Sequence, residues 1–246
     1  MRMNMGKIYV VGIGPGDAEM MTAQAKKALD ESDIIAGYKT YIALVRELYP
    51  DKEYYENGMR GEIERCEKCV EFARAGKTVA LVCSGDAGVY GMASPLLEVA
   101  EREGFSDISI IPGVTAALSG AAELGAPLST DFCVISLSDL LTPWDVIEKR
   151  LLGAAKGDFC MAIYNPASKG RADYLKKACE ILLQELSGDT PCGYVRNIGR
   201  EGCEKKVCTL SQLADAQVDM FVTVFIGNSQ TKIVNGKLIT PRGYKV

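Results

Sequence analysis

The sequence contains no histidine, the side chain that proteins use most often as a general base and as a metal ligand. A Ser-His-Asp catalytic triad and a histidine-containing zinc site are therefore excluded. Any acid–base chemistry must come from aspartate, glutamate, tyrosine, lysine or cysteine.

The sequence also lacks long apolar runs and blocks of one charge. No apolar stretch approaches the roughly 20 residues that a bilayer-spanning helix requires, and the first residues lead into a predicted strand without a signal-peptide layout. The 28 lysines and arginines are scattered among 32 acidic residues, so the net charge is −4. We therefore expect a cytoplasmic protein without nucleic-acid or membrane partners.

The nine cysteines show no pattern typical of a metal site. Most lie in apolar runs, as free buried thiols do in a reducing compartment. Cys66 and Cys69 form a C-x-x-C, but apolar residues recur around them at helical spacing, so we interpret them as the core face of a helix. Cys203 and Cys208 have no second pair at zinc-ligand spacing. We predict no metal site.

What the sequence does contain is three glycine-bearing turns, each directly after an apolar run. They are Gly-Ile-Gly-Pro-Gly-Asp at 12–17, Ser-Gly-Asp-Ala-Gly-Val-Tyr-Gly at 84–91, and Pro-Gly-Val-Thr-Ala at 112–116. Glycine lets backbone approach a ligand closely, and the carboxyl ends of strands open onto the ligand cleft of an α/β sheet. Three such turns in the first half predict one shared binding site.

Strand-like and helix-like segments alternate through the first half of the chain. The predicted strands are 7–11, 33–36, 78–83 and 107–111, and the predicted helices are 22–32, 40–49, 62–75, 92–103 and 116–124. This alternation predicts an α/β fold with a mainly parallel sheet that helices cover on both faces.

The second half has a different rhythm, with strands predicted at 132–137, 159–164, 192–197 and 221–226, a further strand at 205–209, and a helix over 169–186. Asn235-Gly236 between apolar residues predicts a hairpin. A mixed sheet fits this pattern. The 246 residues, 48% of them hydrophobic, suffice for one large or two medium domains. We place the boundary in the Gly, Pro, Ser and Thr cluster at 125–130, which gives domains 1–128 and 129–246.

The first turn differs from a dinucleotide-binding loop. A Rossmann fingerprint reads G-x-G-x-x-G with a helix starting at once. Here Pro15, which has no N–H to offer a phosphate, stands in the third gap, and the helix begins only near Thr22. The alternative is a tight strand-to-helix turn in which Asp17 caps backbone N–H groups.

The order and spacing of the three turns resemble those of the tetrapyrrole methylases, a class of S-adenosylmethionine enzymes unrelated in fold to Rossmann methyltransferases. In the second half, the segments 135–144, 164–166, 196–200, 225–229 and 240–244 resemble the precorrin-3B C17-methyltransferases of that family and their cobalt-precorrin counterparts.

The resemblance implies two α/β domains of the class III methyltransferase type, a homodimer, and S-adenosylmethionine in a cleft between the domains, with S-adenosylhomocysteine as product. The implied reaction is methylation of C17 of precorrin-3B or cobalt-precorrin-3, coupled to ring contraction. The sequence has no cysteine-rich extension after the 240–244 element, so no iron–sulfur cluster is expected.

The resemblance also places the cofactor against particular residues, namely Pro15, Ser84, Gly85, Asp86, Val89, Tyr90, Thr115, Ala116, Tyr164, Asn197 and Ile198. A helix cap is the alternative for Asp86, and plain packing is the alternative for Val89 and Ala116.

The implied substrate carries many acetate and propionate groups, so an acidic protein must gather positive charge locally to hold it. The residues expected to bind it are Gly14, Lys39, Arg196, Arg200 and Arg242, with Arg60 and Lys169 beside further glycine-containing loops. The alternative for each charged residue is an ordinary solvated charge.

Asp17 is the first candidate for the acid–base group of ring contraction, with capping as the equal alternative; Tyr164, Asp139 and Lys39 are substitutes. Trp144, the single tryptophan, could line the face of the macrocycle, and the equal alternative is a tryptophan buried in the core or at a dimer contact.

Three other functions stay open at this point. The same fold could methylate another tetrapyrrole position, which the 136–144 and 240–244 elements argue against. A non-catalytic nucleotide-binding module would bind S-adenosylmethionine without turnover. A dinucleotide oxidoreductase would bind NAD(P), which the Pro15 turn argues against.

Overall fold

A computed structural model describes residues 5–168 and 170–245, and the chain divides after Ala116 into two compact units. The sequence predicted this boundary after residue 128. In the structure, nearly all of helix α5 (Ala116–Leu124) and the segment that follows it belong to the second unit. A Cβ on Gly120 of α5 would lie 2.8 Å from both Ile198 and Phe225, so this helix packs directly on the second unit. Within the described part of the chain, no helix is both long and apolar enough to cross a membrane.

The N-terminal unit is built on one five-stranded sheet. Its strands are β1 (Ile8–Gly12), β2 (Ile34–Tyr38), β3 (Glu53–Asn57), β4 (Val79–Cys83) and β5 (Ile108–Ile111), in the order β3-β2-β4-β1-β5. All neighbours are parallel, as predicted. The five strands therefore end at the same edge of the sheet.

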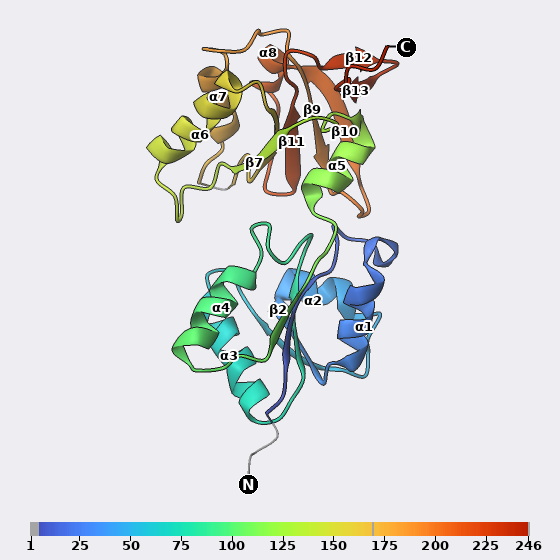
Figure 1. Ribbon diagram of the computed structural model, residues 1–246, viewed down its shortest axis with the longest axis vertical. Coiled ribbons are helices and arrows are strands. Elements are labelled where there is room, and N and C mark those ends of the chain that lie inside the picture. Colours follow the sequence, from blue (N-terminus) through green and yellow to red (C-terminus); the bar gives the residue numbers. More distant parts are fainter. Residues whose placement is uncertain (1–4, 169, 246) are drawn as a thin grey trace. The chain divides into compact units, whose positions relative to one another are not determined.

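Helices cover both faces of this sheet (Figure 1). Helices α1 (Ala23–Glu31) and α2 (Lys39–Arg46) lie on one face, and α3 (Glu62–Arg74) and α4 (Ala93–Arg102) lie on the other. Successive residues of a strand point to opposite faces, so alternate positions of the fully buried β4 pack against different helix pairs. Cys66 and Cys69 are buried in α3, as predicted.

The C-terminal unit contains a mixed five-stranded sheet, again as predicted. Its strands are β7 (Phe132–Ser136), β8 (Cys160–Tyr164), β9 (Pro191–Arg196), β10 (Glu204–Thr209) and β11 (Val222–Ile226), in the order β10-β9-β11-β8-β7. Only β7 and β8 are parallel neighbours. Consequently β7, β8 and β9 end at the edge where β11 begins.

Helices α6 (Trp144–Lys156), α7 (Tyr174–Leu182) and α8 (Leu210–Leu213) pack on one face of this sheet, and α5 packs on the other (Figure 1). A small third sheet joins β6 (Gly125–Ala126) to the hairpin of β12 (Lys232–Val234) and β13 (Lys237–Ile239). The predicted hairpin turn is present; Asn235 and Gly236 both have positive φ, as a type I′ turn requires.

Candidate functional site

The three glycine turns meet at the carboxyl ends of β1, β4 and β5. Gly14 and Gly85 exchange backbone hydrogen bonds, of 3.0 Å from Gly14 N and 2.7 Å from Gly85 N. A Cβ on Gly12 would lie 2.6 Å from Gly113 N and 2.8 Å from Gly85 O. The three backbones therefore approach one another as closely as only glycine permits, as one shared site requires; the binding site itself stays a prediction.

Gly85 itself is buried beside this contact, where the second turn meets the third. Its φ of +73° is one that L-residues rarely adopt. A Cβ there would still lie 3.7 Å from Thr115 Cα and 3.8 Å from Ala116 N, which is ordinary contact distance. The second turn therefore packs at ordinary distance against the third, whose Thr115 and Ala116 are half-buried.

Asp86 ties the second turn to the third. Its Oδ1 accepts the N–H groups of Gly88 (2.8 Å) and Val89 (2.9 Å), and its Oδ2 accepts that of Gly113 (3.0 Å). Burial would raise the pKa of this carboxyl, but the backbone N–H donors outweigh burial and hold the pKa below its ordinary value. Asp86 is therefore an ionised anchor of both turns, which agrees with the capping interpretation; its contact with a cofactor stays a prediction.

Asp17 caps the short 3₁₀ helix η1 (Ala18–Met20), because its Oδ1 accepts the N–H of Glu19 at 2.8 Å. The capping interpretation is thus confirmed. The side chain is exposed, so the carboxylate also stays accessible, and its acid–base role stays a prediction.

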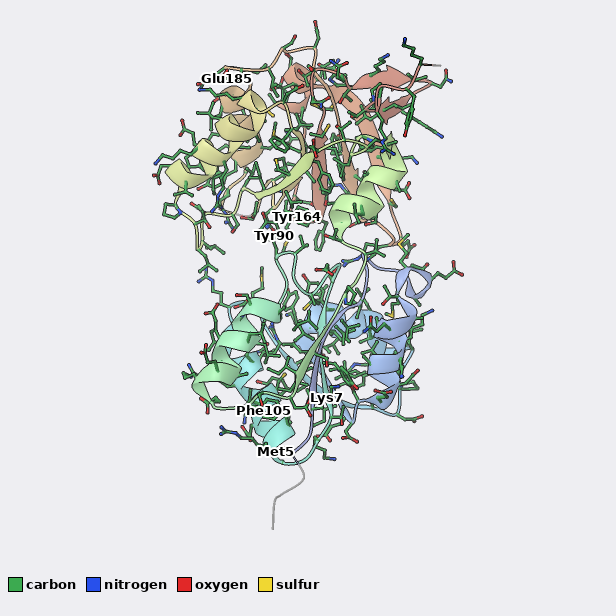
Figure 2. All side chains as sticks on the ribbon, viewed as in Figure 1. Met5, Lys7, Tyr90, Phe105, Tyr164 and Glu185 are labelled. Carbon is green, nitrogen blue, oxygen red and sulfur yellow. The ribbon has the colours of Figure 1, made fainter. Side chains whose placement is uncertain are left out.

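Other predicted residues of the N-terminal unit stand at the same edge. Tyr90 is 55% exposed with a φ of 54°, and Figure 2 shows it at the opposite end of this unit from Lys7, which precedes β1. Ser84 and Val89 are half-buried, and Pro15 is buried. Lys39 follows β2 and lines a cavity of about 500 Å³ together with Ala43, Arg46, Glu47 and Glu56.

In the C-terminal unit, Tyr164, Asn197 and Ile198 share one sheet edge. Tyr164 ends β8, and its hydroxyl accepts the N–H of Ala117 at 2.7 Å, near the start of α5. Figure 2 shows Tyr164 at the opposite end of this unit from Glu185. Asn197 follows β9 in the left-handed region with a φ of 51°, and Ile198 is buried.

The predicted arginines differ in their surroundings. Arg196 bonds to Asp219 and donates to the carbonyl of Gln217 at 3.1 Å, so it holds the 217–219 segment against β9. Arg200 is half-buried on the turn after β9. Arg242 is exposed and lies two residues beyond Thr240. Because Thr240 contacts Cys160 at the start of β8, Arg242 is not at the sheet edge where β8 ends with Tyr164. Lys169 lies outside the described residues.

Asp139 takes part in a network that the sequence did not predict. Its Oδ2 accepts the hydroxyl of Tyr174 at 2.6 Å, and Arg171 Nη1 lies 3.2 Å from its Oδ1. The Tyr174 hydrogen bond, assisted by Arg171, lowers the pKa of Asp139. The Trp144 ring packs against Tyr174 in a tilted arrangement, with ring centroids 4.6 Å apart, which fits the packing interpretation. Residues Arg171 and Tyr174 were missed because no short-range spacing links them to Asp139.

Comparisons with known proteins agree with this arrangement. A family model described as Tetrapyrrole (Corrin/Porphyrin) Methylases matches residues 7–214. A probable cobalt-factor III C(17)-methyltransferase of Salmonella typhimurium is 48% identical over 96% of this chain and 99% of its own length. A precorrin-3B C(17)-methyltransferase of a Sinorhizobium species is 38% identical over 97% of both chains. The crystal structure of the methyltransferase CobJ superposes with a TM-score of 0.88 at 38% identity, covering 96% of this chain and all of that one.

Proposed function

The chain belongs to the tetrapyrrole methylases, and we propose that it transfers a methyl group from S-adenosylmethionine to C17 of a cobalamin-pathway tetrapyrrole, coupled to ring contraction. The observation that supports this most strongly is the meeting of three glycine turns at one strand edge. The names of relatives at 48% and 38% identity over nearly the whole chain point to C17. The homodimer and the cytoplasmic location belong to the same proposal.

The residues present fit S-adenosylmethionine. Beside Gly85, the half-buried Thr115 and Ala116 would offer backbone hydrogen-bonding groups and little bulk to a nucleoside. Tyr90 adds an exposed aromatic ring at the same edge of the N-terminal unit. The proposed contacts in that unit are Pro15, Ser84, Gly85, Asp86, Val89, Tyr90, Thr115 and Ala116, and those in the C-terminal unit are Tyr164, Asn197 and Ile198.

S-adenosylmethionine, when bound, supplies a methyl group on a positively charged sulfur, and that charge disappears in the transition state. The protein therefore needs no strong catalytic group for the transfer itself, and positioning carries the rate. Orientation of this kind contributes roughly 7–11 kcal/mol. Asp86 contributes to this positioning by joining the second turn to the third, and the Gly14–Gly85 bridge contributes by joining the first turn to the second.

We favour a cobalt-bearing substrate, cobalt-factor III, over metal-free precorrin-3B because the cobalt-factor III relative is the more similar one. The test is anaerobic incubation with labelled S-adenosylmethionine and each tetrapyrrole in turn, following label and absorbance together. We expect label transfer with a spectral change on cobalt-factor III. Transfer to precorrin-3B alone would assign the metal-free substrate instead. Cofactor binding without transfer to either would leave methylation at another tetrapyrrole position or a non-catalytic module.

Asp17→Asn separates capping from acid–base chemistry. Asparagine caps about as well as aspartate, so we expect an unchanged unfolding temperature. Ring contraction should fall by about 10²- to 10⁴-fold, the usual contribution of a positioned acid–base group. The measurement is the spectrum and mass of the product, with Glu19→Gln as a control that removes a neighbouring exposed carboxylate. Unchanged contraction would leave Asp17 with the capping role alone.

A further inference from the structure

Two turns at one edge of the C-terminal sheet share an unusual construction. The first follows β7 and has Asp139 directly before Leu140 and Leu141, which are 64% and 98% exposed. Arg171, on the loop after β8, bonds to Asp139 and donates to the hydroxyl of Ser138 at 2.9 Å. Two large apolar side chains thus stand in solvent on a turn that is firmly held.

The second turn precedes β11 and has Asp219 directly before Met220 and Phe221, which are 45% and 46% exposed. Arg196 of β9 bonds to this aspartate, whose Oδ1 also accepts the N–H of Phe221 at 2.9 Å. The carbonyl of Phe221 accepts the N–H of Asn197 at 3.1 Å. Again an arginine from a neighbouring segment fixes an aspartate that carries two exposed apolar residues.

The two turns lie at the same sheet edge, with β8 between the strands that carry them. Neighbouring strands are about 4.8 Å apart, so the ends of β7 and β11 are separated by roughly 10 Å. Tyr164, which ends β8, stands between them in the strand order, and Arg200 lies on the turn after β9 at this edge. The edge therefore combines apolar tips with a cationic residue.

We infer that the turns 138–141 and 219–221 form the surface that receives the macrocycle of the tetrapyrrole, and that Arg171 and Arg196 are positioning residues for it. The inference rests on the proposed function. A tetrapyrrole is a broad, flat, largely apolar ring with carboxylates at its rim, so it needs apolar contacts across its face and arginine at its periphery. Two pairs of exposed apolar side chains, on turns that adjoin strand ends roughly 10 Å apart, match that chemistry, as does Arg200 at the same sheet edge.

Rigid anchoring is what distinguishes these tips from ordinary exposed residues. Single apolar side chains on a surface are common, but ordering them in advance reduces the entropy lost when a ligand binds. Each arginine is itself held, since Arg171 Nε also donates to Ser168 at 2.9 Å and Arg196 also reaches the carbonyl of Gln217. Arg196, which the sequence assigned to substrate carboxylates, thereby acts through Asp219.

The test is direct titration of the wild-type protein and variants with cobalt-factor III, followed by absorbance, which requires no turnover. L140S/L141S and M220S/F221S should each raise the dissociation constant about tenfold or more, because apolar contact area is lost. Binding of S-adenosylhomocysteine, measured by calorimetry, should not change. Leu183→Ser is the matched control, because Leu183 is 39% exposed directly after α7.

A double-mutant cycle tests the positioning role. Arg171→Gln should weaken binding several-fold, Arg171→Lys should restore part of it, and Arg171→Gln should add little in the L140S/L141S background, because both changes remove the same contact. If the wild-type protein binds cobalt-factor III and L140S/L141S and M220S/F221S bind it equally well, this inference is overturned and the proposed function is not affected. A lower molecular mass of L140S/L141S in solution with unchanged tetrapyrrole binding would also overturn the inference, because it would show that the two leucines contact a second copy of this chain. Failure of the wild-type protein to bind either cobalt-factor III or precorrin-3B would overturn the proposed function as well.

Discussion

Replacing Gly113 with alanine is expected to abolish measurable methyl transfer and to destabilise the N-terminal unit. A Cβ at this position would collide with Gly85 O and lie 2.6 Å from the carbonyl carbon and oxygen of Gly12. All of these are backbone atoms, so no side chain can rotate away, and the third turn must separate from the other two. Overpacking of this kind costs about 1–3 kcal/mol.

We expect Gly113→Ala to unfold several degrees lower and to bind S-adenosylmethionine at least about 100-fold more weakly, because the turn that carries Thr115 is displaced. Circular dichroism and calorimetric titration measure the two effects. Gly153→Ala is the control, since a Cβ there meets nothing within 4 Å. Normal cofactor affinity in Gly113→Ala would show that contact between the turns is unimportant for binding.

Asp86→Ala is expected to have the second largest effect, because three backbone N–H groups lose their acceptor at once. An unsatisfied donor costs about 1–3 kcal/mol when buried. Since the carboxylate is only partly buried, we expect a total loss of about 2–4 kcal/mol in the free energy of unfolding. Affinity for S-adenosylmethionine should fall with it, because the second and third turns are no longer joined.

Asp86 also predicts that the free energy of unfolding depends on pH. The pKa of Asp86 is lowered in the folded protein, so its stabilisation is present above the unfolded pKa of about 3.9 and is lost as the pH falls through the folded pKa. Between about pH 4 and pH 2, Asp86→Asn should therefore lose less stability than the wild-type protein. Denaturant unfolding at several pH values measures this, and parallel curves for the two proteins would exclude Asp86 as the titrating group.

The convergence of the turns could be predicted from sequence because glycine turns directly followed apolar runs, and parallel strands end at one edge. Among the elements that were missed, β3 and α6 were missed for different reasons. Strand β3 carries exposed Glu53 and Glu56 at the sheet edge, so it has no apolar run. Helix α6 does bear apolar residues at helical spacing, with Ile147 and Leu151 buried, and the signal was present but lay beyond the segment treated as a family motif.

The side-chain partners at the site could not be predicted. Arg196 lies 23 residues from Asp219, and Arg171 lies 32 residues from Asp139. Only the strand order β9-β11-β8-β7 brings each pair together, and no local spacing encodes it. The sequence therefore assigned Arg196 to substrate without revealing that its guanidinium also holds the 217–219 segment; its contact with substrate stays a prediction.

The most direct test of the proposed function is the position of the transferred carbon. The wild-type protein, incubated anaerobically with cobalt-factor III and S-adenosylmethionine carrying a ¹³C-methyl group, should yield a product whose ¹³C resonance correlates with C17 of the macrocycle. Gly113→Ala under the same conditions should yield none. Label on another ring carbon would contradict C17 specificity, and equal labelling by Gly113→Ala would contradict the role of the three joined turns.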